Sequence, residues 1–76
     1  MKTVKEIYKV WINQSWKYVK IIRKESKKEL NKDGTLDSAA WTEIINEIML
    51  TELNAEDWRY LGEENEKLTA RITIKV

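Results

Sequence analysis

The sequence contains no cysteine, histidine, proline or phenylalanine among its 76 residues. Without cysteine, the chain has neither a disulfide nor a thiolate metal ligand. Without histidine, it lacks the most common general base and the usual partner of a serine or cysteine nucleophile. Its core must therefore combine aliphatic residues with four tryptophans and three tyrosines. We expect one small domain over residues 1–76, with no cofactor and no enzymatic activity.

Long apolar runs and glycine-rich segments are also absent. Lys2, Lys5 and Glu6 interrupt the first residues, and no stretch approaches the roughly 18 apolar residues that suggest a membrane span. The chain has only two glycines, which excludes a glycine-rich phosphate loop. We expect a soluble, cytoplasmic protein that does not enter a membrane.

The two halves of the chain carry opposite charge. Residues 1–34 contain ten basic residues (lysine or arginine) and four acidic ones. Residues 35–76 contain four basic residues and nine acidic ones. The simplest interpretation is that the halves attract each other and face solvent. The functional interpretation is that each half forms a charged binding surface.

The C-terminal segment KLTARITIKV has the clearest periodicity. Apolar residues from Leu68 to Val76 alternate with polar ones, which predicts a half-buried strand over residues 68–76. A strand needs a hydrogen-bonding partner, so this prediction constrains the N-terminal half.

Residues 4–23 fit either a helix or a hairpin. Their lysines fall within one arc of a helical wheel, which favours a long amphipathic helix. In contrast, residues 7–12 (IYKVWI) and 16–22 (WKYVKII) are rich in β-branched and aromatic side chains, which favours strands. A hairpin is the better prediction, because a helical N-terminus leaves the C-terminal strand without a partner in the same chain.

The polar segment NQS, residues 13–15, predicts a three-residue hairpin loop. Pairing across it sets Ile12 opposite Trp16 and Val10 opposite Tyr18.

Two helices are predicted between the hairpin and the last strand. Residues 37–53 have helical apolar spacing after Asp37 or Ser38, both suitable N-caps. Residues 54–62 (NAEDWRYLG) start with an N-cap asparagine and end in glycine, which predicts a short helix presenting Trp58 and Leu61.

The predicted fold is α+β, with a three-stranded antiparallel sheet and both helices on one face. The alternative is a mostly helical protein whose C-terminal strand pairs with that of a second chain.

The segment ELNKDGTLDSAA, residues 29–40, partly matches a twelve-residue calcium loop. With Gly34 at the sixth position, oxygen-bearing residues occupy the first, third, fifth and ninth positions. The twelfth position, which needs a bidentate glutamate, is Ala40. Because NKDG is also a common turn sequence, we expect a turn and a helix N-cap without a bound metal.

Basic and aromatic residues are interleaved in the N-terminal half. On a hairpin, Lys9, Trp11, Lys17 and Val19 are expected to share the face away from the helices. Such a face stacks bases and neutralises phosphates. The residues predicted to bind nucleic acid are Lys9, Trp11, Lys17, Lys20 and Arg23, drawn from a wider set that includes Trp16, Tyr18, Lys24, Lys27 and Lys28. The simpler interpretation is an aromatic core with a solvated lysine rim.

Acidic residues dominate the predicted helices. The residues predicted to form an acidic docking surface are Glu43, Glu47, Glu52, Glu56 and Asp57, with Trp58 and Tyr60 as aromatic anchors. Such a surface can occupy a basic, phosphate-binding groove of a partner protein. The simpler interpretation is a solvated helix face.

The missing catalytic groups favour a protein that acts by binding. Our first prediction is a protein-binding module that docks through the acidic helical surface on a basic groove. Phages and mobile elements encode small inhibitors of this kind against host nucleic-acid-handling machinery, including anti-CRISPR-type proteins. The second prediction is a nucleic-acid-binding module that uses the basic hairpin, and a homo-oligomer joined through the C-terminal strand is compatible with either. The distinguishing feature is which charged patch is contiguous and flanked by exposed aromatics.

Overall fold

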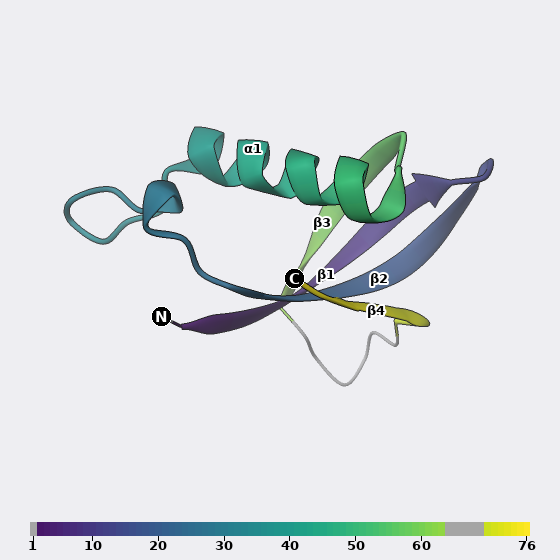
Figure 1. Ribbon diagram of the computed structural model, residues 1–76, viewed down its shortest axis with the longest axis horizontal. Helices are drawn as coiled ribbons and strands as arrows, with labels where there is room; N and C mark the ends of the chain where they lie inside the picture. The colour runs from purple at the N-terminus through teal and green to yellow at the C-terminus, as the bar shows by residue number, and fades with distance from the viewer. Residues whose placement is uncertain (1, 64–69) are drawn as a thin grey trace.

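Four strands form one sheet with the spatial order β3-β1-β2-β4, and helical segments cover one of its faces (Figure 1). The computed structural model describes residues 2–63 and 70–76. Its elements are β1 (Thr3–Ile12), β2 (Ser15–Lys24), the 3-10 helix η1 (Lys27–Glu29), α1 (Ser38–Ile48), the π-helical turn η2 (Met49–Leu53), β3 (Asp57–Glu63) and β4 (Ile72–Lys75).

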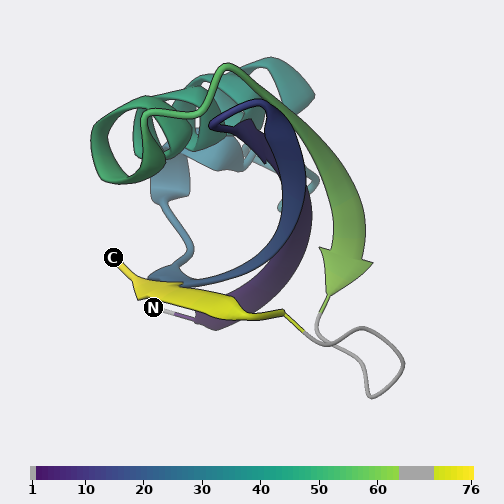
Figure 2. The same ribbon diagram turned by 90° about the vertical axis from the view of Figure 1, so that its right-hand side faces the viewer.

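The sheet curves around the helical layer, so that it has a concave and a convex face (Figure 2). The concave face carries the core, in which Tyr8, Val10, Val19 and Ile21 pack with the buried side chains of Ile45, Ile48 and Met49. Because side chains alternate along a strand, the intervening residues of β1 and β2 lie on the convex face. None of the described helices is long and apolar enough to cross a membrane.

The hairpin turn contains two residues, Asn13 and Gln14, with φ of 51° and 63°. Positive φ at both central positions is what a type I′ turn requires, and its twist matches the twist of the flanking strands. The predicted three-residue loop is therefore wrong by one residue, which changes the cross-strand pairs. The observed pairs next to the turn are Ile12–Ser15, Trp11–Trp16 and Val10–Lys17.

The first predicted helix is confirmed as α1, which continues into η2. Asp37 is its N-cap, and Asp37 Oδ1 accepts a hydrogen bond from the Ala40 N–H at 3.2 Å. This bond satisfies one of the backbone donors that a helix leaves unpaired at its N-terminus. Ile45 and Ile48 then face the sheet at helical spacing.

The second predicted helix is wrong, because residues 57–63 form β3. Asn54 has φ of 49° and ends the helical segment as a C-cap, whereas the sequence suggested an N-cap. In β3, Trp58 and Tyr60 alternate with Arg59 and pair antiparallel with β1. Aromatic residues fit a half-buried sheet well, while a short helix in isolation has marginal stability.

The predicted C-terminal strand is confirmed over residues 72–75, and the predicted start at residues 68–69 lies outside the described part of the chain. The three-stranded antiparallel sheet is wrong, because β3 occupies the edge of β1 and β4 pairs in parallel with β2. The mostly helical alternative is also wrong, since the hairpin forms and β4 pairs within the chain. The α+β class holds, with four strands and one α-helix in residues 2–63 and 70–76 instead of three and two.

Candidate functional site

Aromatic and basic side chains gather on the convex face near the hairpin turn. The strand pairing places Lys9 and Trp11 of β1, Trp16 and Tyr18 of β2 and Arg59 of β3 on this face. We call these five residues the aromatic surface. The helical layer packs on the concave side (Figure 2), and none of the described helices covers these side chains.

The Trp16 ring contacts two other residues of the aromatic surface. Trp11 and Trp16 meet edge to face, with their ring centroids 5.3 Å apart. Lys9 Nζ lies 4.8 Å from the ring centroid of Trp16, a cation–π contact that contributes about 0.5–1 kcal/mol at an exposed site. Trp16 and Tyr18 still expose 39% and 48% of their surface. The Trp16 ring is therefore held in place, and both Trp16 and Tyr18 remain accessible to a ligand.

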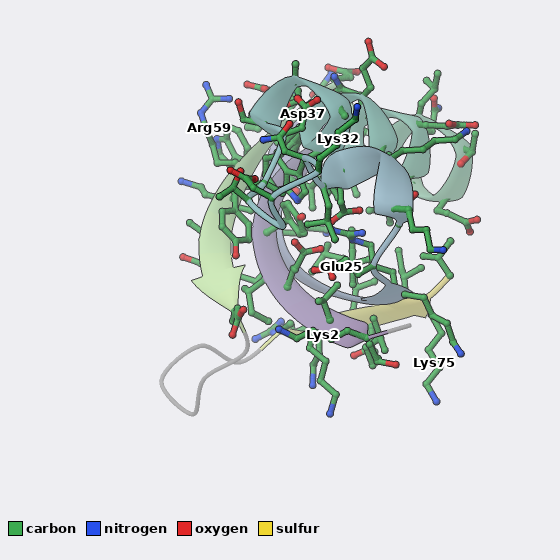
Figure 3. The ribbon with its side chains drawn as sticks, turned by 90° about the vertical axis from the view of Figure 1, so that its left-hand side faces the viewer. Lys2, Glu25, Lys32, Asp37, Arg59 and Lys75 are labelled. Carbon is green, nitrogen blue, oxygen red and sulfur yellow. The ribbon has the colours of Figure 1, made fainter. Side chains whose placement is uncertain are left out.

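Positively charged residues lie on the same face as these rings. Arg59 Nη1 lies 2.9 Å from Asp57 Oδ1, and the two side chains are 64% and 48% exposed. Exposed ion pairs contribute about 0–1 kcal/mol, so a phosphate can replace this carboxylate at small cost. Figure 3 shows Arg59 and Lys75 at opposite edges of the sheet. The other lysines of the convex face are Lys5, Lys20, Lys24 and Lys75.

The structure separates the residues predicted to bind nucleic acid. Lys9 and Trp11 lie on the convex face as expected, and Lys20 lies there too. Lys17 pairs with Val10 and belongs to the other face, where it is exposed near the turn. Val19, which was expected beside these residues, is buried in the core. Arg23 is only 4% exposed and does not belong to the aromatic surface.

Arg23 instead bridges two buried carboxylates on the concave side. Its Nε donates to Glu6 Oε1 at 2.7 Å, and its Nη1 donates to Glu29 Oε2 at 2.8 Å. The Trp41 Nε1–H and the Ser26 N–H donate to Glu6 and Glu29 at 3.3 Å and 3.2 Å. Both carboxylates therefore serve as hydrogen-bond acceptors inside the fold, and this cluster has a structural role.

In this cluster, burial disfavours the charged forms of the side chains, and pairing between opposite charges favours them. Burial alone disfavours the ionised form of Glu29, but hydrogen bonds from Arg23 and the Ser26 N–H outweigh it and lower the pKa of this carboxyl. For Arg23, burial favours deprotonation, while hydrogen bonds to Glu29 and Glu6 raise its pKa above the usual value. The Tyr8 hydroxyl is buried without a hydrogen-bond partner among the described residues. Burial, followed by the charge of Glu6, raises the pKa of Tyr8.

A cavity of about 260 Å³ opens beside this cluster. Lys2 and Glu25 line it and lie at the open end between the sheet and the helical layer (Figure 3). Arg23 and Glu29 also line this cavity, and their charged groups are paired with each other.

The helical side of the molecule is acidic. Residues 33–58 contain no lysine or arginine, and Leu50 on this side is 64% exposed. The exposed acids are Glu43, Glu47, Glu52 and Glu56. Asp57 does not join them, because it lies on the convex face and binds Arg59.

The two predicted aromatic anchors belong largely to the packing of the concave face. Trp58 meets Tyr8 and Trp41 with centroid distances of 5.6 Å and 5.8 Å, and its Nε1–H donates to Asn46 Oδ1 at 2.7 Å. Tyr60 lies 5.3 Å from Trp41 and remains 44% exposed. The exposed aromatics that flank a charged patch are thus mainly on the basic side.

The segment that partly matched a calcium loop forms a turn. Glu29, at the first ligand position, binds Arg23. Asp33 accepts hydrogen bonds from the N–H and the hydroxyl of Thr35 at 3.0 Å and 2.6 Å, and these bonds lower its pKa. Gly34 supplies the positive φ of 87°. No group of three or more acids in residues 2–63 and 70–76 is placed to hold a metal ion.

Part of the aromatic surface was not predicted from the sequence. Arg59 was assigned to a helix, and the shifted register put Trp16 and Tyr18 on the wrong face. The available signal was loop length, because two-residue connections are the most common in hairpins. Comparison of the chain with family models, curated proteins and solved structures finds no match, so no relative supplies a function.

Proposed function

We propose that the protein binds nucleic acid through the aromatic surface of its sheet. The observation that carries this proposal is the placement of exposed Trp16 and Tyr18 beside Lys9 and Arg59 on one face. Aromatic rings stack with bases of any sequence, and lysine and arginine neutralise phosphates. The acidic residues of α1 lie on the opposite side of the sheet, where they repel the ligand least.

The charge near the turn sets the expected salt dependence. Lys9 and Arg59 belong to the aromatic surface, and Lys17 and Arg71 are exposed beside it. If three of these four cations each neutralise one phosphate, the slope of log K against log salt concentration is about −2 for a single strand. Raising the salt from 50 to 200 mM then weakens binding roughly 20-fold.

The test is fluorescence anisotropy with labelled single-stranded RNA and DNA at these two salt concentrations. The variant Lys9→Gln/Lys17→Gln removes two charges near the turn, and the matched control Lys27→Gln/Lys28→Gln removes two exposed charges from η1. We expect the first variant to bind at least fivefold more weakly and to show a smaller salt slope, with little change in the control. Equal weakening in both variants, or no binding of the wild type at low salt, would exclude this function.

A second candidate is the protein-binding module that docks through the acidic helical surface. It is favoured by the exposure of Leu50 at helical spacing from Glu43 and Glu47, since an apolar residue within an acidic patch suits an interface. The partner is a protein with a basic groove, such as a host nucleic-acid-handling machine inhibited by a phage or mobile-element protein of the anti-CRISPR type.

Charge-swap variants separate the two candidates. Glu43→Lys/Glu47→Lys abolishes partner capture if the acidic surface docks, while Lys9→Glu/Lys17→Glu leaves capture intact. Loss of capture only in the second variant rules out docking through the helical surface. A homo-oligomer joined at the outer edge of β4 remains compatible with both candidates, and sedimentation of the free protein tests it.

A further inference from the structure

A groove lies at the edge of β2, next to the aromatic surface. β4 pairs only with Val19–Ile22 of β2, so residues 15–18 have no strand beside them on this edge in the part of the chain that the structure describes. The groove has a volume of about 410 Å³, within the roughly 300–1,000 Å³ of ligand-binding clefts. It is lined by Trp16, Lys17, Tyr18, Arg71 and Ile72.

The spacing of these two residues along β2 is compatible with base stacking. Trp16 and Tyr18 are two residues apart on one strand, so their Cα atoms are separated by about 6.8 Å along the strand axis. Successive stacked bases are about 3.4 Å apart, and one base inserted between two aromatic planes therefore needs about 6.8 Å. Both rings are partly exposed, at 39% and 48%, which leaves surface for the base to cover.

The remaining groups suit the backbone of the same nucleotide. Lys17 and Arg71 are exposed and line the groove from β2 and from the segment before β4. These cations attract the phosphates on either side of an inserted base. Ile72 supplies an apolar wall. No carboxylate lines the groove, so its described lining does not repel phosphate.

We infer that this groove holds one unstacked base of a single-stranded nucleic acid, between Trp16 and Tyr18. This inference rests on the proposed function and narrows its ligand. A base inside a duplex is stacked and paired and cannot enter the groove, so duplexes are left with phosphate contacts only. The protein therefore discriminates single strands from duplexes, and within single strands it senses the base as well as the charge.

The test compares three probes of equal length by anisotropy at 50 mM salt, and the normal and abasic single strands have the same number of phosphates. They are a 12-nucleotide pyrimidine strand, the same strand in a duplex, and a 12-unit strand of abasic sites. Base stacking contributes about 1–3 kcal/mol per base. We therefore expect the wild type to bind the abasic strand at least fivefold more weakly than the normal strand, and the duplex equally weakly. The normal strand is tested as RNA and as DNA, because both present the same bases and phosphates to the groove.

Two variants assign the effect to the groove. Trp16→Ala/Tyr18→Ala should lose the preference for the normal strand over the abasic one, while keeping its salt slope. Lys17→Gln/Arg71→Gln should weaken binding of both strands by the same factor and reduce the slope by about 1 to 1.5. Tyr18→Leu, which keeps an apolar side chain at this position of the strand, is the companion variant. Urea denaturation midpoints establish that each variant is folded.

The outcomes distinguish this inference from the function on which it rests. Equal wild-type affinity for the three probes, with the expected salt slope, overturns the inference that the groove holds a base. It leaves the proposed nucleic-acid binding in place. A preference for the normal strand over the abasic strand that survives in Trp16→Ala/Tyr18→Ala also overturns the inference that the groove holds a base. Absence of binding to every probe overturns the proposed function itself.

Discussion

The two faces of the β1–β2 hairpin are built from alternating residues of the same strands, yet the aromatic residues on them differ in burial. On the concave face, Tyr8, Val10 and Val19 are fully buried beneath the helical layer. On the convex face, Trp16 and Tyr18 remain partly exposed beside lysines. The difference shows that amino-acid composition does not assign an aromatic residue to core or surface. Register does, because one residue of slip exchanges the two faces.

The two arginines of the sheet make the same comparison for charge. Arg23, on the concave face, is 4% exposed and binds Glu6 and Glu29. Arg59, on the convex face, is 64% exposed and binds Asp57. The bonds have similar lengths, but removal of a partner leaves a buried uncompensated charge only on the concave face. We therefore expect the concave arginine to determine stability and the convex one to be available for a ligand.

The largest expected effect on stability comes from replacing Arg23, and the matched replacement of Arg59 provides the comparison. Arg23→Met should lower the free energy of unfolding by about 3–5 kcal/mol, because two carboxylates stay buried without their cation. Arg59→Met should lower it by less than about 1 kcal/mol. Urea denaturation followed by tryptophan fluorescence measures both.

If Arg23→Met does not fold, a variant with an apolar triad keeps the prediction testable. Arg23→Met/Glu6→Leu/Glu29→Met removes the charges together and should recover most of the lost stability, since buried ion pairs can be replaced by apolar residues of similar volume. Equal losses for Arg23→Met and Arg59→Met would contradict the assignment of the two faces.

The next comparison uses neighbouring residues of β2 that lie on opposite faces. Val19→Ala deletes buried methyl groups and should cost about 2 kcal/mol of folding free energy, with unchanged affinity for nucleic acid. Tyr18→Ala should cost less than 1 kcal/mol in stability and weaken binding about tenfold. Urea midpoints and anisotropy on the same preparations test both statements. A stability loss for Tyr18→Ala that exceeds the loss for Val19→Ala would mean that the convex face is a second core.

A smaller effect is expected from the pH dependence of the buried cluster. Since the pKa of Glu29 is lower in the folded state than its ordinary value of 4.5, the unfolded chain binds its proton first as the pH falls. The stabilisation is therefore complete above about pH 4.5 and is lost as the pH falls through the folded pKa. Glu29→Gln should be less stable than the wild type at pH 7, and this gap should shrink towards pH 3.

The matched control for this titration is Glu43→Gln, because Glu43 is an exposed glutamate on α1. Its stability at pH 7 should differ little from that of the wild type, as is usual for an exposed surface substitution. A constant gap between Glu29→Gln and the wild type over this range would show that ionised Glu29 contributes nothing to folding.

The sequence predicted elements with a local cause and missed those that depend on long-range pairing. The capping of α1 by Asp37 and the strand at residues 72–75 follow from side-chain types and periodicity. The short segment 54–63 carries both predicted helix caps and alternating aromatics, and only the free edge of β1 selects the strand. The basic and aromatic character of the hairpin was predictable. The exclusion of Arg23 from the aromatic surface was not predictable, because the burial of Arg23 depends on Glu6 and Glu29, which lie on different elements.

The smallest effect concerns the turn that fixes this register. Gln14 has φ of 63°, a left-handed conformation that costs a residue with a side chain about 1–2 kcal/mol, and glycine is preferred there in type I′ turns. Gln14→Gly should raise the free energy of unfolding by about 0.5–1 kcal/mol, since glycine's extra freedom in the unfolded chain offsets part of the relief. Affinity for nucleic acid should not change, because the same pairs form. Loss of stability in this variant, measured by urea denaturation, would indicate that the two-residue turn does not set the register that separates the two faces.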